Sequence, residues 1–282
     1  MGGLSQRSRP ERILMRAMKT TVLSMLALSA VALSSCSGDM DGNVISGDDK
    51  DVEKLTAEIV NVHPFDDSSF TQGLEMDGDD LIVGTGLYGQ SEIYRRDVTT
   101  GDRAETVRVP KVYFGEGLTI HNDHIWQLTW KSGIAFKRDR QSLEITEPVT
   151  IGKEAWGVCS NQDTLYVSDG TDTISFHDPD DFTPTGSITV DLGGEPVTNI
   201  NELECVDGFI YANVWQSTDI IKINPDTGEV VSVVDASGLE NTSEPDPDNV
   251  LNGIAYRKDT DTFFLSGKRW NDLYEVRFVP EA

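Results

Sequence analysis

The chain has 282 residues, in which 48 acidic residues outnumber 23 basic ones and give a formal net charge of −25. A surface this acidic repels nucleic acid, so a nucleic-acid-binding role is excluded. Three cysteines are too few for a disulfide framework or a zinc motif, and we interpret Cys159 and Cys205 as small buried hydrophobic residues, with a pairing between them left open.

The first 36 residues have the pattern of an export signal. Basic Arg12, Arg16 and Lys19 precede an apolar run over 21–33 that is too short to cross a bilayer. The run ends in Leu33-Ser34-Ser35-Cys36, which resembles the lipobox of bacterial lipoproteins, so we expect Cys36 to be lipidated and to anchor the protein to a membrane. An ordinary secretory signal is the alternative. Either interpretation predicts an exported protein, and the lipoprotein would face the periplasm or the cell exterior.

Residues 37–54 follow the signal and differ from it in composition. They are rich in glycine, aspartate and serine and show no apolar period. This composition predicts a flexible acidic linker that separates the membrane anchor from a domain over 55–282.

Residues 55–282 contain five similar units of about 45 residues. Each unit opens with glycine or glutamate followed by an aliphatic residue, at Gly73-Leu74, Gly117-Leu118, Gly157-Val158, Glu202-Leu203 and Gly253-Ile254. A second apolar segment follows, starting at Leu81, Ile125, Leu165, Ile210 and Phe263. A third segment, with β-branched and aromatic residues, comes at Ile93, Ile134, Ile174, Ile220 and Leu273, and turn sequences then lead into a fourth strand. This pattern predicts an all-β, five-bladed β-propeller with four antiparallel strands per blade.

The two ends of this domain are expected to pair. The fifth unit stops at Phe278 without an outer strand of its own, whereas a strand-like segment, Ala57 to Val62, precedes the first unit. Pairing of the two would close the ring with an N-terminal strand and protect an open sheet edge.

The first strand of each unit carries residues that a purely structural repeat does not need. Equivalent or adjacent positions hold Gln72, Glu116, Trp156, Asn201 or Glu202, and Asn252. In a propeller the innermost strands line the central axis, so we expect these side chains to crowd around one mouth of the channel, where ligands commonly bind.

Nine motifs, in order, carry a resemblance to a known family. They are Phe70-Thr71-Gln72-Gly73-Leu74, Thr85-Gly86-Leu87-Tyr88-Gly89, Phe114-Gly115-Glu116-Gly117-Leu118-Thr119, Trp156-Gly157, Ser168-Asp169-Gly170-Thr171, Asn201-Glu202-Leu203-Glu204, Asn213-Val214-Trp215-Gln216, Val250-Leu251-Asn252-Gly253-Ile254-Ala255 and Ser266-Gly267-Lys268-Arg269-Trp270. Over Phe70 to Phe278 the chain resembles the plant-type glutaminyl-peptide cyclotransferases, also found in bacteria, which are five-bladed propellers that need no metal or other cofactor.

The resemblance implies an enzyme that converts the N-terminal glutamine of peptides or proteins to pyroglutamate and releases ammonia. It implies that Glu116 is the catalytic residue. It also implies a substrate pocket made by Phe70, Gln72, Trp130, Trp156, Asn201, Trp215 and Lys268. We expect the protein to act as a monomer.

The reaction itself explains why a carboxylate is needed. The α-amine of the substrate must attack its own side-chain amide, and at neutral pH that amine is largely protonated. A single carboxylate that takes a proton from the amine and returns it to the departing nitrogen suffices, and we expect Glu116 to do both. Gly115 and Gly117 would leave room for substrate. Donors to the carboxamide oxygen could come from Gln72, Asn201, Trp130 or Trp215.

Two other functions fit parts of the same pattern. A propeller lactonase or hydrolase would hold a divalent cation on the axis, and Glu116, Asn201, Glu202 and Asn252 could imitate its ligands. A non-catalytic propeller that presents its loops to a partner protein is the second alternative.

Several further residues are expected to be structural. Trp126 and Trp270 are expected to pack, and Asp169 to close a turn. The four histidines, His63, His121, His124 and His177, have no helical metal spacing and are expected at the surface.

Overall fold

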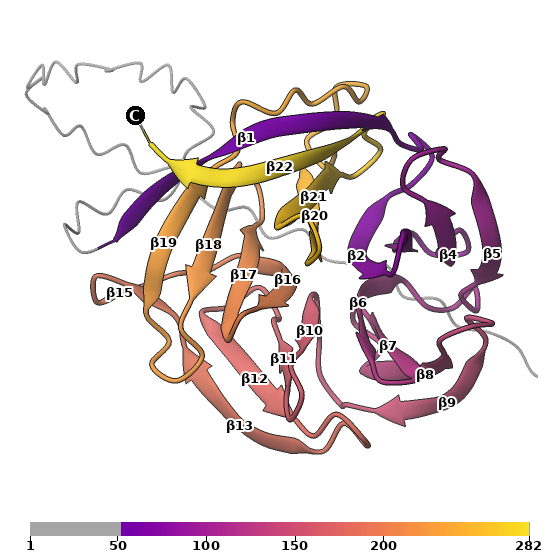
Figure 1. Ribbon diagram of the computed structural model, residues 1–282. Coiled ribbons are helices and arrows are strands. Elements are labelled where there is room, and N and C mark those ends of the chain that lie inside the picture. Colours follow the sequence, from indigo (N-terminus) through magenta and orange to yellow (C-terminus); the bar gives the residue numbers. More distant parts are fainter. Residues whose placement is uncertain (1–51, 282) are drawn as a thin grey trace, which may run out of the picture. The chain divides into compact units, whose positions relative to one another are not determined.

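The computed structural model describes residues 52–281, and these form β-strands joined by turns and loops (Figure 1). The predicted signal over 1–36 and nearly all of the linker over 37–54 lie outside the described residues. Within residues 52–281 no helix is long and apolar enough to cross a membrane.

The strands form antiparallel units of four. The innermost strands are β2 (Thr71–Asp77), β6 (Gly115–His121), β10 (Val158–Ser160), β16 (Ile200–Val206) and β20 (Leu251–Arg257). The second strands are β3 (Asp80–Thr85), β7 (His124–Thr129), β11 (Leu165–Val167), β17 (Phe209–Val214) and β21 (Thr262–Gly267). The third strands are β4 (Glu92–Asp97), β8 (Ile134–Asp139), β12 (Thr173–His177), β18 (Asp219–Ile223) and β22 (Asp272–Pro280). The outer strands of the first four units are β5 (Arg103–Arg108), β9 (Ile145–Thr150), β13 (Pro184–Thr189) and β19 (Val230–Asp235). Each second strand begins within one residue of the position predicted from the sequence, which confirms the spacing of the repeat.

The outer strand of the fifth unit is β1 (Glu53–Pro64), from the opposite end of the domain. It pairs antiparallel with β22, from Leu55 opposite Pro280 to Pro64 opposite Asp272. The predicted pairing of Ala57 to Val62 with the last unit is therefore confirmed, although the strand begins four residues earlier than expected. Its first residues also pair in parallel with β19, so the fourth and fifth units share one eight-stranded sheet. A short hairpin of β14 (Asp191–Leu192) and β15 (Glu195–Pro196) precedes the fourth unit and was not predicted.

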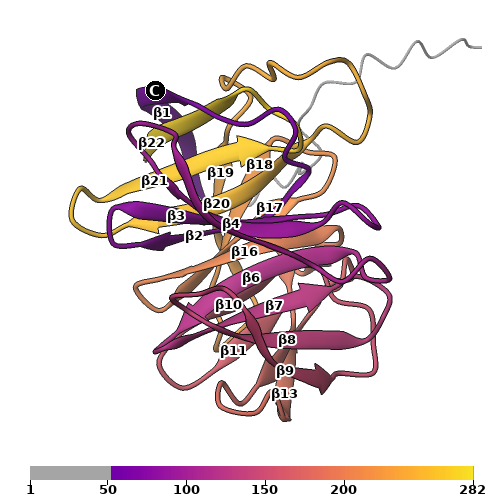
Figure 2. The ribbon, with the colours of Figure 1, turned by 90° about the vertical axis from the view of Figure 1, so that its right-hand side faces the viewer.

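The innermost strands contact one another in succession. β2 contacts β6, β6 contacts β10, β10 contacts β16, β16 contacts β20, and β20 contacts β2 (Figures 1 and 2). The aliphatic residue that opens each unit is buried, as Leu74, Leu118 and Ile254 illustrate. Burial of one such side chain stabilises the fold by roughly 1.5–3 kcal/mol.

Glycines allow the innermost strands to come this close. A Cβ atom on Gly117 would lie 2.7 Å from the backbone oxygen of Trp156, and one on Gly157 would overlap the backbone of Asn201. A Cβ on Gly115 would likewise meet the backbone oxygen of Thr85. The expectation that Gly115 and Gly117 leave room for substrate is therefore wrong, because both face neighbouring backbone.

Buried carboxylates bridge the same strands where glycine is absent. Glu202 accepts hydrogen bonds from the backbone N–H groups of Leu74 on β2 (3.3 Å) and Ile254 on β20 (2.9 Å). Glu204 accepts one from Tyr256 on β20 (2.9 Å). Burial raises the pKa of both glutamates well above the ordinary value. Both side chains are therefore structural and satisfy backbone donors of the adjacent units.

Two sequence interpretations of minor residues need correction. Cys159 on β10 and Cys205 on β16 form a disulfide between adjacent innermost strands. All four histidines are buried rather than exposed. His177, for example, contacts the backbone oxygen of Phe182 at 3.0 Å through Nδ1. These side chains lie near loops in the sequence, but they fill space between strands.

Candidate active site

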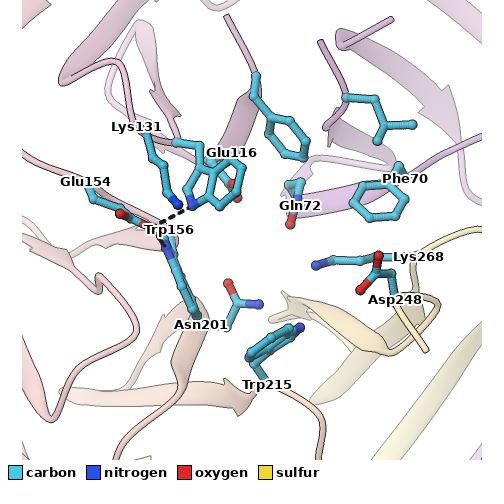
Figure 3. Close-up of a pocket in the computed structure, with 13 residues that line it drawn as sticks. Phe70, Gln72, Glu116, Lys131, Glu154, Trp156, Asn201, Trp215, Asp248 and Lys268 are labelled. Atoms are coloured by element: carbon cyan, nitrogen blue, oxygen red, sulfur yellow. Dashed lines mark hydrogen bonds between the residues drawn. The ribbon is translucent and has the colours of Figure 1, made fainter. Parts of the chain in front are cut away.

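One cavity of about 360 Å³ opens at the end of the sheets where the innermost strands begin. All eight site residues predicted from the sequence line this cavity, namely Phe70, Gln72, Glu116, Trp130, Trp156, Asn201, Trp215 and Lys268 (Figure 3). They come from all five units. Of the residues that the repeat pattern identified, Gln72, Glu116, Trp156 and Asn201 are brought together here, whereas Glu202 and Asn252 do not line the cavity.

These residues converge because each unit presents two chain segments at the same edge. An innermost strand begins where the antiparallel second strand ends, so residues around the two positions are neighbours. Trp130, which follows β7, donates its backbone N–H to Phe114, which precedes β6, at 3.1 Å. Lys268, which follows β21, makes the equivalent bond to Val250 at 3.0 Å.

Irregular pairing turns the functional side chains toward the cavity. The register between the innermost and second strands shifts between Thr71 and Gly73, and again between Gly115 and Leu118. A similar shift lies between Ile200 and Leu203. Gln72, Glu116 and Asn201 each sit inside one of these shifts. β-Bulges commonly re-aim side chains next to active sites, and they do so here.

Glu116 is a buried carboxyl group facing this cavity, with 5% of its surface exposed. Burial raises its pKa well above the ordinary value, the charge of Lys268 opposes that rise, and Glu154 adds to it. No hydrogen bond contributes to this pKa, in contrast to the pKa of Glu202, which two backbone donors lower.

Lys268 is the basic residue whose charge lowers the pKa of Glu116. It is 6% exposed, and burial lowers the pKa of its ammonium group while Glu116 and Asp248 oppose that decrease. Its Nζ also lies 5.0 Å from the centre of the Phe70 ring, within the range of a cation–π contact.

Aromatic rings form the walls of the cavity. The Phe114 and Trp130 rings lie 5.4 Å apart, and the Trp156 and Trp215 rings meet edge to face at 5.9 Å. Lys131 at the rim places its Nζ 4.0 Å from the Trp130 ring. Such walls suit a small substrate group with an apolar stem.

Glu154 fixes two of these indoles. Its Oε1 accepts hydrogen bonds from Nε1 of Trp130 (2.7 Å) and from Nε1 of Trp156 (3.0 Å), drawn as dashed lines in Figure 3. The indole N–H of Trp130 is therefore already engaged, and the expectation that it could stabilise an oxyanion does not hold. Gln72, Asn201 and Trp215 are left as candidate donors.

The amide of Gln72 has a defined orientation. Nδ2 of Asn252 donates both to the backbone oxygen of Thr71 (3.1 Å) and to Oε1 of Gln72 (3.0 Å). A backbone carbonyl can only accept a hydrogen bond, so the atom of Asn252 that contacts it must be the amide nitrogen. The atom of Gln72 that the same nitrogen contacts must then be the amide oxygen. Gln72 is thus left with its Nε2–H group as the free donor.

Five cavity residues were not assigned to the site from the sequence. They are Leu87, Phe114, Lys131, Glu154 and Asp248. Leu87 and Phe114 belong to quoted motifs and could have been found, since each lies at the pocket end of a strand. Glu154 and Asp248 lie in loops without a repeated pattern, so the sequence offered no comparable signal.

The four residues that could imitate a cation site, Glu116, Asn201, Glu202 and Asn252, do not all face one cavity. Both carboxylate oxygens of Glu202 accept backbone N–H groups, and neither Glu202 nor Asn252 lines the cavity that contains Glu116 and Asn201. Within residues 52–281, no group of three or more His, Cys, Asp or Glu side chains is arranged to hold a metal ion.

Trp126 and Trp270 pack as expected, each donating its indole N–H to a buried backbone oxygen. Asp169 closes its predicted turn through Thr171.

The arrangement suits proton transfer in a site largely shielded from water. A carboxyl group with a raised pKa can both accept and return a proton near neutral pH. A buried ammonium and free amide N–H groups can stabilise developing negative charge.

Comparisons with known proteins agree with this geometry. The model of the family described as glutamine cyclotransferase matches residues 26–278. A glutaminyl-peptide cyclotransferase from Arabidopsis thaliana is 35% identical over 226 residues, which cover 78% of this chain and 70% of that protein. The crystal structure of Myxococcus xanthus glutaminyl cyclase is similar with a TM-score of 0.77 and 34% identity, covering 82% of this chain and all of that chain.

Proposed function

Because this chain belongs to the glutamine cyclotransferase family and is thus an enzyme, we propose that it cyclises the N-terminal glutamine of peptides or proteins to pyroglutamate, with Glu116 as general base and general acid. The observation that carries the proposal is the buried Glu116 carboxyl facing an aromatic cavity.

The proposed reaction proceeds through a tetrahedral intermediate. The unprotonated α-amine of the substrate attacks the carbon of the side-chain amide to form a five-membered ring, and the Glu116 carboxylate takes one proton from the attacking nitrogen, which keeps its other hydrogen. Glu116 then gives the proton to the amide nitrogen, the bond between that nitrogen and the carbon breaks, and ammonia leaves. General acid and base catalysis of this kind contributes about 10²–10⁴-fold.

Other residues supply binding and charge stabilisation. The indoles of Trp156 and Trp215 would enclose the substrate and hold the amine against the carbonyl, which lowers the entropic part of the barrier. The Nε2–H of Gln72 is suited to donate to the carboxamide oxygen as negative charge develops there. Asn201 and Lys268 are further candidates for this role.

The test is ammonia release from a short peptide that begins with glutamine. We expect Glu116→Gln to lower kcat by about 10²–10⁴-fold while the protein keeps its melting temperature and its affinity for the product peptide. Glu147→Gln is the matched control, because Glu147 is an exposed glutamate on β9. A Glu116→Gln protein with the kcat of the control would refute the assignment, whereas a wild-type protein without ammonia release would refute the proposed activity.

We further propose that the protein is exported and anchored through a lipid on Cys36, with its peptide substrates outside the cytoplasm. The Cys159–Cys205 disulfide supports this, because disulfides persist mainly in oxidising compartments. Fractionation of producing cells tests it: Cys36→Ala should move the protein from the membrane fraction to the soluble fraction. Membrane attachment that survives the substitution would contradict the lipid anchor.

The architecture we propose is a five-bladed β-propeller closed by β1. The successive contacts among the five innermost strands and the antiparallel pairing of β1 with β22 support it. The similarity to a solved glutaminyl cyclase supports it as well. Deletion of residues 53–64 should then prevent folding of the domain, and a deletion variant with the thermal transition of the wild type would argue against this closure.

A further inference from the structure

Glu154 contacts two walls of the cavity at once. It lies between β9 and β10, two residues before Trp156, and a single carboxylate oxygen accepts both indole N–H groups. Trp130 belongs to the second unit and Trp156 begins the third. The bond pair therefore connects adjacent units at the mouth of the proposed active site.

We propose that Glu154 is a positioning residue of this site, which holds the indoles of Trp130 and Trp156 in place and keeps a negative charge beside Glu116. The proposal rests on the proposed function, since it concerns the same pocket. It assigns Glu154 two separable properties, an acceptor oxygen and a charge.

The acceptor oxygen determines where the indoles lie. Trp130 packs on Phe114 and Trp156 packs on Trp215, so both rings are also held by neighbours. Ring packing leaves an indole free to slide in its own plane, whereas an N–H bond to a fixed oxygen removes that freedom. Loss of the acceptor would leave two partly buried N–H donors without a partner, which costs free energy and favours other ring positions.

The charge acts on the proton affinity of Glu116. The charged groups that line the cavity around Glu116 are Lys131, Glu154, Asp248 and Lys268. Glu154 raises the pKa of Glu116 and Lys268 lowers it. Through its charge Glu154 therefore makes Glu116 a stronger base.

Two substitutions separate the properties. Glu154→Gln retains an Oε1 atom that can accept both indole N–H groups, but it removes the charge. We expect its KM to stay within about twofold of the wild-type value. Because a neighbouring negative charge favours the protonated form of Glu116, its removal should shift the acidic limb of the kcat/KM profile to lower pH.

Glu154→Ala removes both properties. We expect its KM to rise by about tenfold, because two walls of the cavity lose the bonds that hold them in the position that binds substrate. Near-ultraviolet circular dichroism should show altered tryptophan bands in Glu154→Ala and unchanged bands in Glu154→Gln. Glu147→Gln again serves as the control, because it removes one negative charge at an exposed position on β9.

The outcomes distinguish this proposal from the proposed function. If Glu154→Gln has the pH profile of the control, the role of the charge is refuted. If Glu154→Ala has wild-type KM and wild-type tryptophan bands, the positioning role is refuted. If the wild type releases no ammonia, the proposed function fails, and the circular dichroism comparison still decides whether Glu154 holds the indoles. If Glu154→Ala does not fold, Glu154→Leu, which fills the same space and also lacks the acceptor oxygen, replaces it in the KM and circular dichroism comparisons.

Discussion

The disulfide between Cys159 and Cys205 is expected to contribute substantially to stability. It joins β10 to β16, and β10 is the shortest of the innermost strands, with three residues. Two cavity residues are close to these cysteines in the sequence: Trp156 lies just before β10, and Asn201 lies on β16. Reduction of the disulfide is therefore a perturbation of the fold close to the site, and it requires no substitution.

The sequence separation of the cysteines sets the magnitude. The disulfide closes a loop of 46 residues. In the chain-entropy description, closure of such a loop lowers the entropy of the unfolded state enough to stabilise the native state by about 4 kcal/mol at 25 °C. For a domain of this size the corresponding decrease in melting temperature on reduction is about 10 °C.

Thermal unfolding with and without a reductant measures this contribution. The wild type should lose about 10 °C in reductant, and a thiol assay should confirm that the bond was opened. The Cys159→Ser, Cys205→Ser double variant is the control, because its melting temperature should not respond to reductant. An unchanged melting temperature of fully reduced wild type would refute the loop-closure argument.

Two further predictions concern polar side chains on the innermost strands, Asn252 on β20 and Glu75 on β2. Asn252→Asp removes the donor that orients Gln72, so kcat should fall by about 100-fold with little change in KM, as expected for one misplaced oxyanion donor; wild-type kcat in this variant would contradict the orientation inferred for Gln72. Burial raises the pKa of Glu75 to about 7, so its contribution to stability is present below its ordinary pKa of 4.5 and is lost as pH rises through 7. Between pH 4.5 and 8 the free energy of unfolding of Glu75→Gln should therefore decrease by about 2 kcal/mol less than that of the wild type, with solvent screening of this partly exposed group allowed for. Urea unfolding at several pH values measures this, and equal pH slopes for the two proteins would contradict it.

The repeat made most of the site predictable from the sequence. Gln72, Glu116 and Asn201 stand at corresponding places in their units, and corresponding places in a repeat converge when the units stack. The family resemblance added residues that follow second strands, such as Trp130 and Trp215. These lie beside the innermost strands because an antiparallel hairpin brings both chain segments to one edge.

Contacts between units were harder to predict. The disulfide left a signal, because Cys159 and Cys205 each follow the opening aliphatic residue of consecutive units and are about one repeat apart. Glu154 left none, since its role depends on a loop conformation and on two indole rotamers from different units. The burial of the histidines was missed for a similar reason, because proximity to a turn in the sequence does not reveal the packing between neighbouring sheets.

The position of the functional residues explains how the repeat can tolerate them. Packing of the innermost strands constrains one position in each unit, where Gly117 and Gly157 approach adjacent backbone and Glu202 instead bonds to it. The residue just before that position lines the cavity in four units, at Gln72, Glu116, Trp156 and Asn201, but not at Asn252 in the fifth. In all but the third unit it lies within a shift of the strand register. The side chain at this place stays out of the close backbone approach, even where it bonds to a neighbouring unit, as Asn252 does to Gln72. Carboxylate, indole and amide groups can therefore occupy equivalent places in different units without disturbing the close approach on which the domain depends.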